Sequence, residues 1–368
     1  MHFTIQRELL LKPLQLVAGV VEKRQTLPIL SNILLTVSDD QKLSLTGTDL
    51  EVELVGRIEL EEPAEAGQIT VPGRKLMDIC KKLPSEALIN FNIDNEKVII
   101  KSGRSRFTLS TLSAKDFPAV NDDEGSLTFN VDQEKLRQLI DKTSFSMAQQ
   151  DVRYYLNGML LEVHGKILRS VATDGHRLAM SYMNIELDQV DRHQIIVPRK
   201  GVSELARLLT EKDQNVTITF GANYIRAKTG EFIFTSKLVE GKFPDYERVL
   251  PQGGDKKLIL KRITLREAFD RVAILSNEKY RGIRLQLVEK LLKIKANNPE
   301  QEEAEEELSL EYQGDELEMG FNVSYLLDIL AKIASDEVEI TLSDANSSAL
   351  IKETDNDSSV YVVMPMRL

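Results

Sequence analysis

The chain has 368 residues, of which 42% are hydrophobic and 29% charged, and its formal net charge is −11. It has no run of about 18 apolar residues, the length that a membrane span requires. Its single cysteine, Cys80, excludes an internal disulfide and a cysteine-rich metal site. Because the N-terminus also lacks the clean apolar core of a signal peptide, we expect a cytoplasmic protein of two or three domains that does not bind membranes.

The first third of the chain alternates between helix-like and strand-like patterns. Apolar residues at helical spacing predict a helix over 7–24, although Pro13 falls inside it and should kink it. Two apolar runs then flank the pair Thr48-Asp49, as strands flank a turn. A second helix is predicted over 72–82, and an alternating run over 88–112 predicts two further strands.

The same order of features returns twice further along the chain. The later helices are predicted over 133–144, 198–209, 262–272 and 322–333, and the later two-strand runs over 216–238 and 338–366. Pro72 and Pro198, which are 126 residues apart, each open a helix, and Asn322 takes this place in the third copy as an N-cap. Four ordered markers at near-constant offsets make accidental similarity between unrelated domains a poor explanation.

We therefore predict an α+β fold of three similar domains, over residues 1–125, 126–254 and 255–368. Polar, glycine-containing stretches at 121–126 and 251–257 mark the two boundaries. No low-complexity linker separates the copies, so we expect them to pack rigidly end to end.

Positive charge is concentrated on the predicted helices. Together they carry a net charge of +9, whereas the rest of the chain carries −20. If the helices share one surface, that surface attracts a polyanion that the remaining surface repels. Lysine and arginine also favour helices for structural reasons, so the charge pattern alone leaves both explanations open.

The string TDGHR, over 173–177, is the most enzyme-like in the chain, because Asp174 and His176 lie two residues apart. No nucleophile or metal motif accompanies it, so a polar turn between strands is the better interpretation. No phosphate-binding glycine loop occurs, and we expect no metal or other cofactor. The acidic run 299–307 lacks the spacing of a calcium loop and indicates a solvated or partner-facing segment.

Two other segments could bind partners. Arg153 precedes the adjacent pair Tyr154 and Tyr155, which could stack on bases, or bury one ring at the end of a strand. The apolar C-terminus, 360–368, contains two methionines and suits adaptable peptide recognition, although a terminal core strand is the safer interpretation.

Several strings together carry a specific resemblance to a known family. They are TLPILSN (26–32), LTGTDLE (45–51), SGRSRF (102–107), QDVRYYLNGML (150–160), VATDGHRLA (171–179), VPRKGV (197–202), EFIFTSKL (231–238), FPDY (243–246), AILSNEK (273–279), ANNPEQEEAEE (296–306) and YVVMPMRL (361–368). The chain resembles the bacterial DNA polymerase III β subunit family, the sliding clamps, over its whole length.

The resemblance implies three DNA-clamp domains, each with two helices packed on antiparallel sheets. Two subunits would form a ring as a head-to-tail homodimer, with helices inside and sheets outside. Double-stranded DNA would pass through the ring without base readout, which fits the charge pattern. The ring would perform no chemistry and would tether the polymerase, which confers processivity. Short linear motifs would attach the DNA polymerase III alpha subunit, the clamp loader, and other polymerases and repair proteins.

The resemblance also implies three sets of site residues. The expected DNA contacts are Arg24, Arg74, Gln150, Tyr154 and Tyr155. The expected partner-motif pocket comprises Leu156, Thr173, Gly175, His176, Leu178, Pro244, Arg248, Val249, Val362, Met364, Pro365 and Met366. The expected subunit contact joins Phe107 and Leu109 to Ile274 and Leu275 of the partner subunit, with the run 299–307 nearby. Glu247, beside Arg248, departs from the family pattern and could alter motif preference.

Two other functions remain open from the sequence. A peptide-binding scaffold without a DNA function fits the net charge of −11 and the apolar C-terminus. A hydrolase would use Asp174 and His176 and would show turnover that depends on the histidine.

Overall fold

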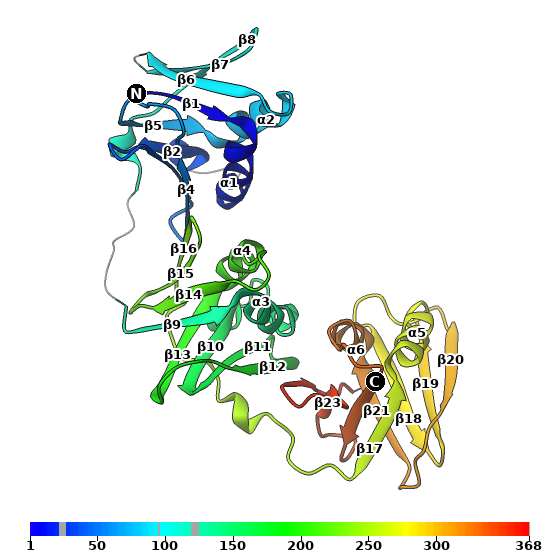
Figure 1. The fold of residues 1–368 in the computed structure, drawn as a ribbon. Coiled ribbons are helices and arrows are strands. Elements are labelled where there is room, and N and C mark those ends of the chain that lie inside the picture. The colour runs from blue at the N-terminus through cyan, green and yellow to red at the C-terminus, as the bar shows by residue number, and fades with distance from the viewer. Residues whose placement is uncertain (22–26, 95, 119–124, 368) are drawn as a thin grey trace. The chain divides into compact units, whose positions relative to one another are not determined.

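The computed structural model describes residues 1–21, 27–94, 96–118 and 125–367. Its elements follow one order three times: a strand, a helix, four strands, a helix and three strands. The α-helices in these ranges are α1 (Arg7–Val20), α2 (Gly73–Lys82), α3 (Gln133–Asp141), α4 (Arg199–Leu208), α5 (Arg262–Ala273) and α6 (Val323–Leu330) (Figure 1). The predicted threefold repeat is confirmed.

The helices begin within one residue of their predicted starts, because their N-terminal signals are local. Asn322 caps α6 as expected, since its side-chain Oδ1 accepts a hydrogen bond from the Ser324 N–H at 2.9 Å. Pro13 lies inside α1 without ending it. Residues 22–26, at the end of the first predicted helix, lie outside the described residues. Within the described part of the chain, each helix is too short or too polar to span a membrane.

Two antiparallel sheets contain strands of the first and second repeats. The four-stranded sheet has the order β1 (His2–Gln6), β6 (Leu88–Asp94), β7 (Lys97–Ser102) and β8 (Ser105–Ser110). The eight-stranded sheet has the order β5 (Gly67–Pro72), β2 (Asn32–Val37), β3 (Lys42–Thr48), β4 (Val52–Glu59), β16 (Phe232–Lys237), β15 (Tyr224–Thr229), β14 (Asn215–Phe220) and β9 (Leu127–Asp132).

Two further antiparallel sheets contain strands of the second and third repeats. The eight-stranded sheet has the order β13 (Val190–Pro198), β10 (Gly158–Gly165), β11 (Ile167–Thr173), β12 (Arg177–Asn184), β24 (Ser359–Val363), β23 (Ala349–Glu353), β22 (Glu337–Leu342) and β17 (Lys256–Lys261). The four-stranded sheet has the order β20 (Glu303–Ser309), β19 (Leu291–Asn297), β18 (Gly282–Val288) and β21 (Leu317–Asn322).

Each run that was predicted as two strands forms three. The run over 88–112 contains β6, β7 and β8, because the chain reverses at the hairpin between Ser102 and Ser105. Gly103 takes a φ of +53° in this turn, a conformation that glycine adopts without strain. The two-strand expectation was wrong because this tight turn interrupts an otherwise continuous alternating pattern.

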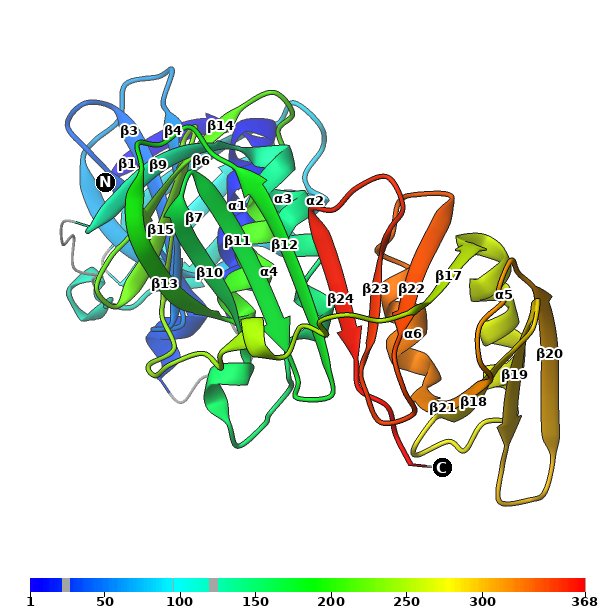
Figure 2. The ribbon, with the colours of Figure 1, turned by 90° about the horizontal axis from the view of Figure 1, so that it is seen from below.

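The eight-stranded sheets each join two successive repeats. Strand β4 pairs with β16, and β12 pairs with β24 in the same antiparallel manner (Figures 1 and 2). In both joints, the third strand of a four-strand group meets the last strand of the next repeat. The repeats are therefore continuous through backbone hydrogen bonds between neighbouring strands.

The chain forms two compact units, and each has its own core. One unit comprises Met1–Glu134 with Ser203–Leu238, and the other comprises Lys135–Val202 with Val239–Leu368. In the first unit, the rings of Phe3 and Phe91 stack with centroids 4.5 Å apart. In the second, Leu265, Phe269 and Val272 follow one face of α5 into a buried cluster.

Candidate functional site

The TDGHR segment forms the turn between β11 and β12. The Asp174 Oδ1 atom accepts hydrogen bonds from the N–H groups of His176 and Arg177 at 2.9 and 3.0 Å. Its Oδ2 atom accepts a bond from the Arg177 guanidinium at 3.0 Å. Thr173 donates its hydroxyl to the Arg177 carbonyl at 2.7 Å. Both carboxylate oxygens of Asp174 therefore serve the turn, and this side chain is not placed as a general base.

The equivalent turn of the first repeat is built in the same way. Thr48 donates its hydroxyl to the Val52 carbonyl at 2.9 Å, and Asp49 accepts the N–H groups of Glu51 and Val52. Since a turn with the same hydrogen bonds recurs without a histidine, the threonine–aspartate pair has a structural role in both repeats.

The segment before β10 is tied to this turn by Arg153. The Arg153 guanidinium donates to both carboxylate oxygens of Asp151, at 3.0 and 2.9 Å, and to the carbonyl of Asp174 at 3.2 Å. The hydrogen bonds from Arg153 lower the pKa of Asp151 to about 2. Asn157 closes the loop by donating its amide to the Asp151 carbonyl at 2.9 Å. The loop that carries Tyr154 and Tyr155 is thus anchored at both ends.

An apolar cavity of about 250 Å³ lies where this loop, the TDGHR turn and the C-terminal strand meet. Its lining residues are Arg153, Tyr155, Leu156, Thr173, Gly175, Arg177, Leu178, Pro244, Tyr246, Val249, Val362 and Met364. Eight of the twelve residues predicted for the partner pocket are among them. A cavity of this size, with apolar walls and a few polar groups, suits the side chains of a short peptide.

Tyr246 forms one wall of the cavity, and its hydroxyl is hydrogen-bonded to the buried carboxylate of Glu162. Its hydroxyl donates to Glu162 Oε1 at 2.9 Å, and Glu162 also accepts bonds from Arg169, Arg192 and Gln194 at 2.5, 2.7 and 2.6 Å. Burial acts to raise the pKa of Glu162, but the bonds from Arg192, Gln194 and Tyr246 outweigh it and lower that pKa. Burial, together with the bond to Glu162, raises the pKa of Tyr246 to about 12.

Four residues predicted for the partner pocket do not line this cavity. The ring of His176 stacks on Tyr325 at 6.4 Å, while its carbonyl accepts the Met364 N–H at 2.9 Å. The side chain of Arg248 is 86% exposed and pairs with Asp245 at 2.8 Å. Pro365 and Met366 continue beyond the cavity, and Met366 lines a second cavity instead.

Sequence reasoning missed Arg153, Arg177 and Tyr246 as wall residues, and it assigned Tyr155 only to DNA. All four lie inside strings that carried the resemblance. Arg177 is held between the rings of Phe145 and Tyr325, 5.2 and 4.5 Å from their centroids, and pairs with Asp328 at 2.6 Å. The family strings could have identified these positions, but their orientation depends on the fold.

The predicted DNA contacts fall in different parts of the chain. Arg74 is exposed on α2 of the first unit. In the second unit, Gln150 is exposed with a φ of +55°, and Tyr154 is 57% exposed with its ring edge against Tyr155. Arg24 lies outside the described residues.

The residues predicted for the subunit contact lie on β8 of one four-stranded sheet and directly after α5, in the repeat that contains the other four-stranded sheet. Phe107 and Leu109 are half-buried on β8, which has one neighbouring strand. Ile274 is 75% exposed directly after α5, and Leu275 follows it half-buried. The acidic run 299–307 extends into β20, which is also at the edge of its sheet. Among the described residues, no cluster of three histidine, cysteine or carboxylate side chains could hold a metal ion.

Known proteins match the chain from end to end. Models of the N-terminal, central and C-terminal domains of the DNA polymerase III beta subunit match residues 1–121, 130–245 and 247–367. The beta sliding clamps of Pseudomonas aeruginosa and Escherichia coli K12 are 70% and 55% identical over 368 residues, and the match covers 100% of both chains in each case. A crystal structure of the P. aeruginosa subunit superposes with a TM-score of 0.98 over 100% of both chains, at 70% identity. The chain therefore belongs to the DNA polymerase III beta subunit family, the sliding clamps.

Proposed function

We propose that this non-catalytic clamp encircles double-stranded DNA in the cytoplasm as a head-to-tail homodimer of three-domain subunits. Its domains would cover residues 1–125, 126–254 and 255–368. The ring tethers the DNA polymerase III alpha subunit, the clamp loader, and other polymerases and repair proteins through their short linear motifs. Nucleotidyl transfer belongs to the polymerase, and the clamp contributes by keeping it at a high effective concentration on DNA.

The strand joints within one chain support a head-to-tail ring. In the first two repeats, the third strand of the four-strand group pairs with the last strand of the following repeat, as β4–β16 and β12–β24. The equivalent third strand of the third repeat is β20, which lies at the edge of its sheet and pairs only with β19 among the described residues. The strand that would continue the series is β8 of a second copy. It is the last strand of the first repeat, as β16 and β24 are of the others, and it lies at the edge of its sheet. This continuation is the observation that carries the proposal.

The same logic gives a strand register for the intermolecular joint. Phe107, Phe234 and Tyr361 are equivalent, since they lie opposite Ile100, Ala227 and Ile351 on the preceding strands. At the two internal joints, Phe234 lies opposite Leu54 and Tyr361 opposite Ala179. Ala304 is the equivalent of Leu54 and Ala179 on β20.

Pairing Phe107 with Ala304 of the partner subunit brings opposite charges together. In this antiparallel register, Arg106 on β8 lies opposite Glu305 of the partner subunit, and Arg104, in the turn before β8, would lie near Glu307 of the partner subunit. Opposite charges across a strand pair are favourable, so this register is compatible with the charges of both strands. The exposed side chain of Ile274 would then be buried against Phe107 of the partner subunit.

Charge on the helices supports DNA passage through the ring. The predicted helices carry +9 and the rest of the chain −20, so a basic lining and an acidic exterior are expected. Arg24, Arg74, Gln150, Tyr154 and Tyr155 are proposed to contact the DNA. Such contacts to phosphates hold the duplex without reading its sequence, which a sliding protein requires.

The apolar cavity is proposed to receive the linear motifs of partners. Leu178, Val362 and Met364 supply apolar wall, and the absence of a side chain at Gly175 lets the Arg153 guanidinium pack against its backbone. His176, Arg248, Pro365 and Met366 remain proposed rim residues, although they do not line the cavity. The hydrolase alternative loses support, because Asp174 is committed to the turn.

The test is retention on nicked circular DNA, loaded with the clamp loader and ATP, before and after the circle is cut. Loss of protein on cutting is expected, because an encircling ring slides off a free end. Retention on the linear form would indicate ordinary electrostatic binding and would overturn the ring. Absence of loading with normal binding of motif peptides would favour the scaffold without a DNA function.

A further inference from the structure

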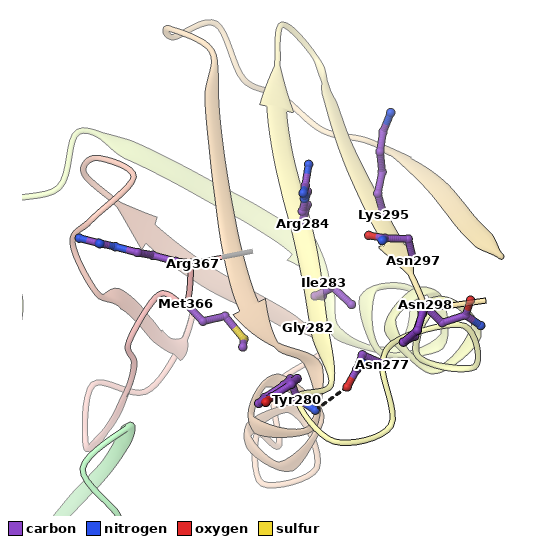
Figure 3. Close-up of a pocket in the computed structure, with 11 residues that line it drawn as sticks. Asn277, Tyr280, Gly282, Ile283, Arg284, Lys295, Asn297, Asn298, Met366 and Arg367 are labelled. Carbon is purple, nitrogen blue, oxygen red and sulfur yellow. Dashed lines mark hydrogen bonds between the residues drawn. The ribbon is translucent and has the colours of Figure 1, made fainter. Parts of the chain in front are cut away.

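A second cavity, of about 450 Å³, opens on the C-terminal four-stranded sheet (Figure 3). Most of it lies on the face opposite the core, because Leu285 and Ile294 point to the buried side while Arg284 and Lys295 stand on the other, although the buried Ile283 also borders it. The segment before β18 and the C-terminal tail complete its border. The family assignment and the proposed motif pocket leave this cavity without a role.

Glycine residues leave room beside its cationic side chains. Arg284 lies directly opposite Lys295 on β19 and opposite Gly320 on β21. Cross-strand neighbours share one face of a sheet, with Cβ atoms about 5 Å apart. Gly282 lines the cavity and Gly320 lies opposite Arg284, so neither of these positions places a side chain beside Arg284.

The lining is cationic and carries amides and a phenol, but no carboxylate. Its charged members are Arg284, Lys295 and Arg367, and among the described residues that line it none is acidic. Arg284 is 46% exposed and is 3.8 Å from Glu318, while Lys295 is 43% exposed and is 3.1 Å from Glu305. Arg367 extends away from these two (Figure 3). Arg284 and Lys295 are cations on adjacent strands, and each is paired with a glutamate that does not line the cavity, so an anion between them would compete with Glu318 and Glu305.

This positive site contrasts with the rest of its repeat. Residues 255–368 carry 15 basic and 23 acidic side chains, a net charge of −8. An acidic ligand is therefore repelled by most of the surface and attracted at this cavity, so a contact here would be selective in position.

The C-terminal tail connects this cavity to the proposed motif pocket. The Met364 N–H donates to the His176 carbonyl at 2.9 Å, and Met364 lines the motif pocket. Two residues later, the Met366 N–H donates to the Gly320 carbonyl at 2.8 Å, and Met366 lines the second cavity. Two residues of extended chain span about 7 Å, so a peptide in the first site reaches the second within a few residues.

We propose that the second cavity binds a glutamate or aspartate side chain that flanks the linear motif of a partner protein. The carboxylate would lie between Arg284 and Lys295, with the Asn297 amide as a further donor and Met366 and Tyr280 against the aliphatic stem. A nucleic-acid phosphate has the same charge, but the shared tail with a peptide pocket favours a peptide. The inference rests on the proposed motif pocket.

The test compares matched peptides on matched variants by fluorescence anisotropy. The probes are a clamp-binding peptide of the polymerase alpha subunit with two glutamates added at one end or the other, and the same peptides with glutamines. The variants are Arg284→Gln with Lys295→Gln, and Lys293→Gln as control. Lys293 stands two residues before Lys295 on β19, pairs with Glu307 at 2.8 Å, and does not line the cavity.

One glutamate peptide is expected to bind the unaltered protein about three- to tenfold more tightly than its glutamine counterpart. The double variant should lose this preference and keep its affinity for the glutamine peptide, whereas Lys293→Gln should retain the preference. The preference should also shrink at about 0.5 M salt, since the cations are partly exposed.

Three outcomes overturn the inference, and each is distinct from failure of the motif pocket. Equal binding of the glutamate and glutamine peptides, whichever end carries the added residues, overturns it. So does an equal loss of the glutamate preference in Lys293→Gln, which would indicate that the general electrostatic field of the surface attracts the peptide. If peptides show no preference while a short oligonucleotide loses affinity in the double variant, the occupant is a phosphate. Failure of the glutamine peptide to bind the unaltered protein would instead overturn the motif pocket itself.

Discussion

Glu162 does not line the motif pocket, but its buried carboxylate binds the hydroxyl of Tyr246, which does. Glu162 has a 1% exposed side chain, and its oxygens hold Tyr246 and two arginines in place. Arg192 also reaches Glu247 at 3.0 Å, so the position at which the sequence suggested a departure from the family pattern belongs to the same network. Changing Glu162→Gln removes the charge that satisfies both arginines, and we expect unfolding to become easier by about 1–3 kcal/mol at neutral pH.

The pH dependence of this loss has a definite sign. The hydrogen bonds lower the folded-state pKa of Glu162, so its stabilisation is complete above the ordinary glutamate pKa of about 4.3 and is lost as pH falls through the lowered value. The difference in unfolding free energy between the unaltered protein and Glu162→Gln, measured in urea, should therefore be constant near pH 7 and shrink below about pH 4. Tyr246→Phe keeps the carboxylate and removes only one of the bonds that lower its pKa, so its loss of stability at pH 7 should be smaller than that of Glu162→Gln. A gap that persists unchanged to pH 3 would contradict the role given to the charge.

The sequence predicts local side-chain roles better than distant ones. Asp174 bonds to groups within three residues, and its identity as part of a turn could be predicted from that short segment. Glu162 finds Arg192 and Tyr246 at separations of 30 and 84 residues. No local pattern marks such a partner, because the sheet brings these strands together only after the fold is formed.

At the scale of elements, the C-terminal tail separates two sites that the sequence treated as one. Met364 lines the motif pocket, whereas Met366 lines the second cavity. We expect Met364→Ala to weaken a motif peptide by about fivefold, since a half-exposed methionine loses on the order of 1 kcal/mol of apolar contact. Met366→Ala should change the affinity of the same peptide less than twofold.

Two measurements check this division of the tail. Anisotropy with an unflanked motif peptide gives the affinities, and sedimentation gives the assembly state of both variants, which should not change. Equal weakening by both substitutions would show that the motif extends over the whole tail. Loss of the dimer in either variant would show that the tail supports the ring instead.

The acidic run at 299–307 shows why element type was harder to predict than helix starts. Residues 303–307 of this run belong to β20, and Ala304 and Leu308 point inward from that strand. Glu306 occupies the inward position between them and pairs with Arg271 at 2.6 Å. Because this inward position is occupied by a glutamate, the sequence of β20 lacks the apolar alternation of a strand. Pro72, Pro198 and Asn322, by contrast, predict helix starts through signals confined to one turn.

At the scale of the whole molecule, the repeat could be predicted but its continuity could not. The threefold order of elements is visible in the sequence because each repeat preserves its local markers. The joints are not, because β4 meets β16 and β12 meets β24 across the repeat boundaries, with pairs such as Leu54 and Phe234. These joints also explain why the compact units do not coincide with the predicted domains.

The continuation of these joints into a second copy gives the most direct prediction. In the inferred register, Arg106 lies opposite Glu305 of the partner subunit, so cysteines at both positions would have Cβ atoms about 5 Å apart. That is close to disulfide geometry, whereas Glu303 of the partner subunit is a diagonal neighbour at about 7 Å. The single natural cysteine, Cys80, is buried and contributes little background.

The variant carrying Arg106→Cys and Glu305→Cys should therefore form intersubunit disulfides under mild oxidation, and the variant carrying Arg106→Cys and Glu303→Cys should form far fewer. Non-reducing electrophoresis distinguishes the possible assemblies. A closed ring of two subunits gives one covalent dimer band, because both joints are satisfied within the pair. An open head-to-tail chain gives a ladder of larger species instead. Preferential linkage through Glu303→Cys would show that the register is shifted by two residues, and no linkage in either variant would show that β8 and β20 are not the joining strands.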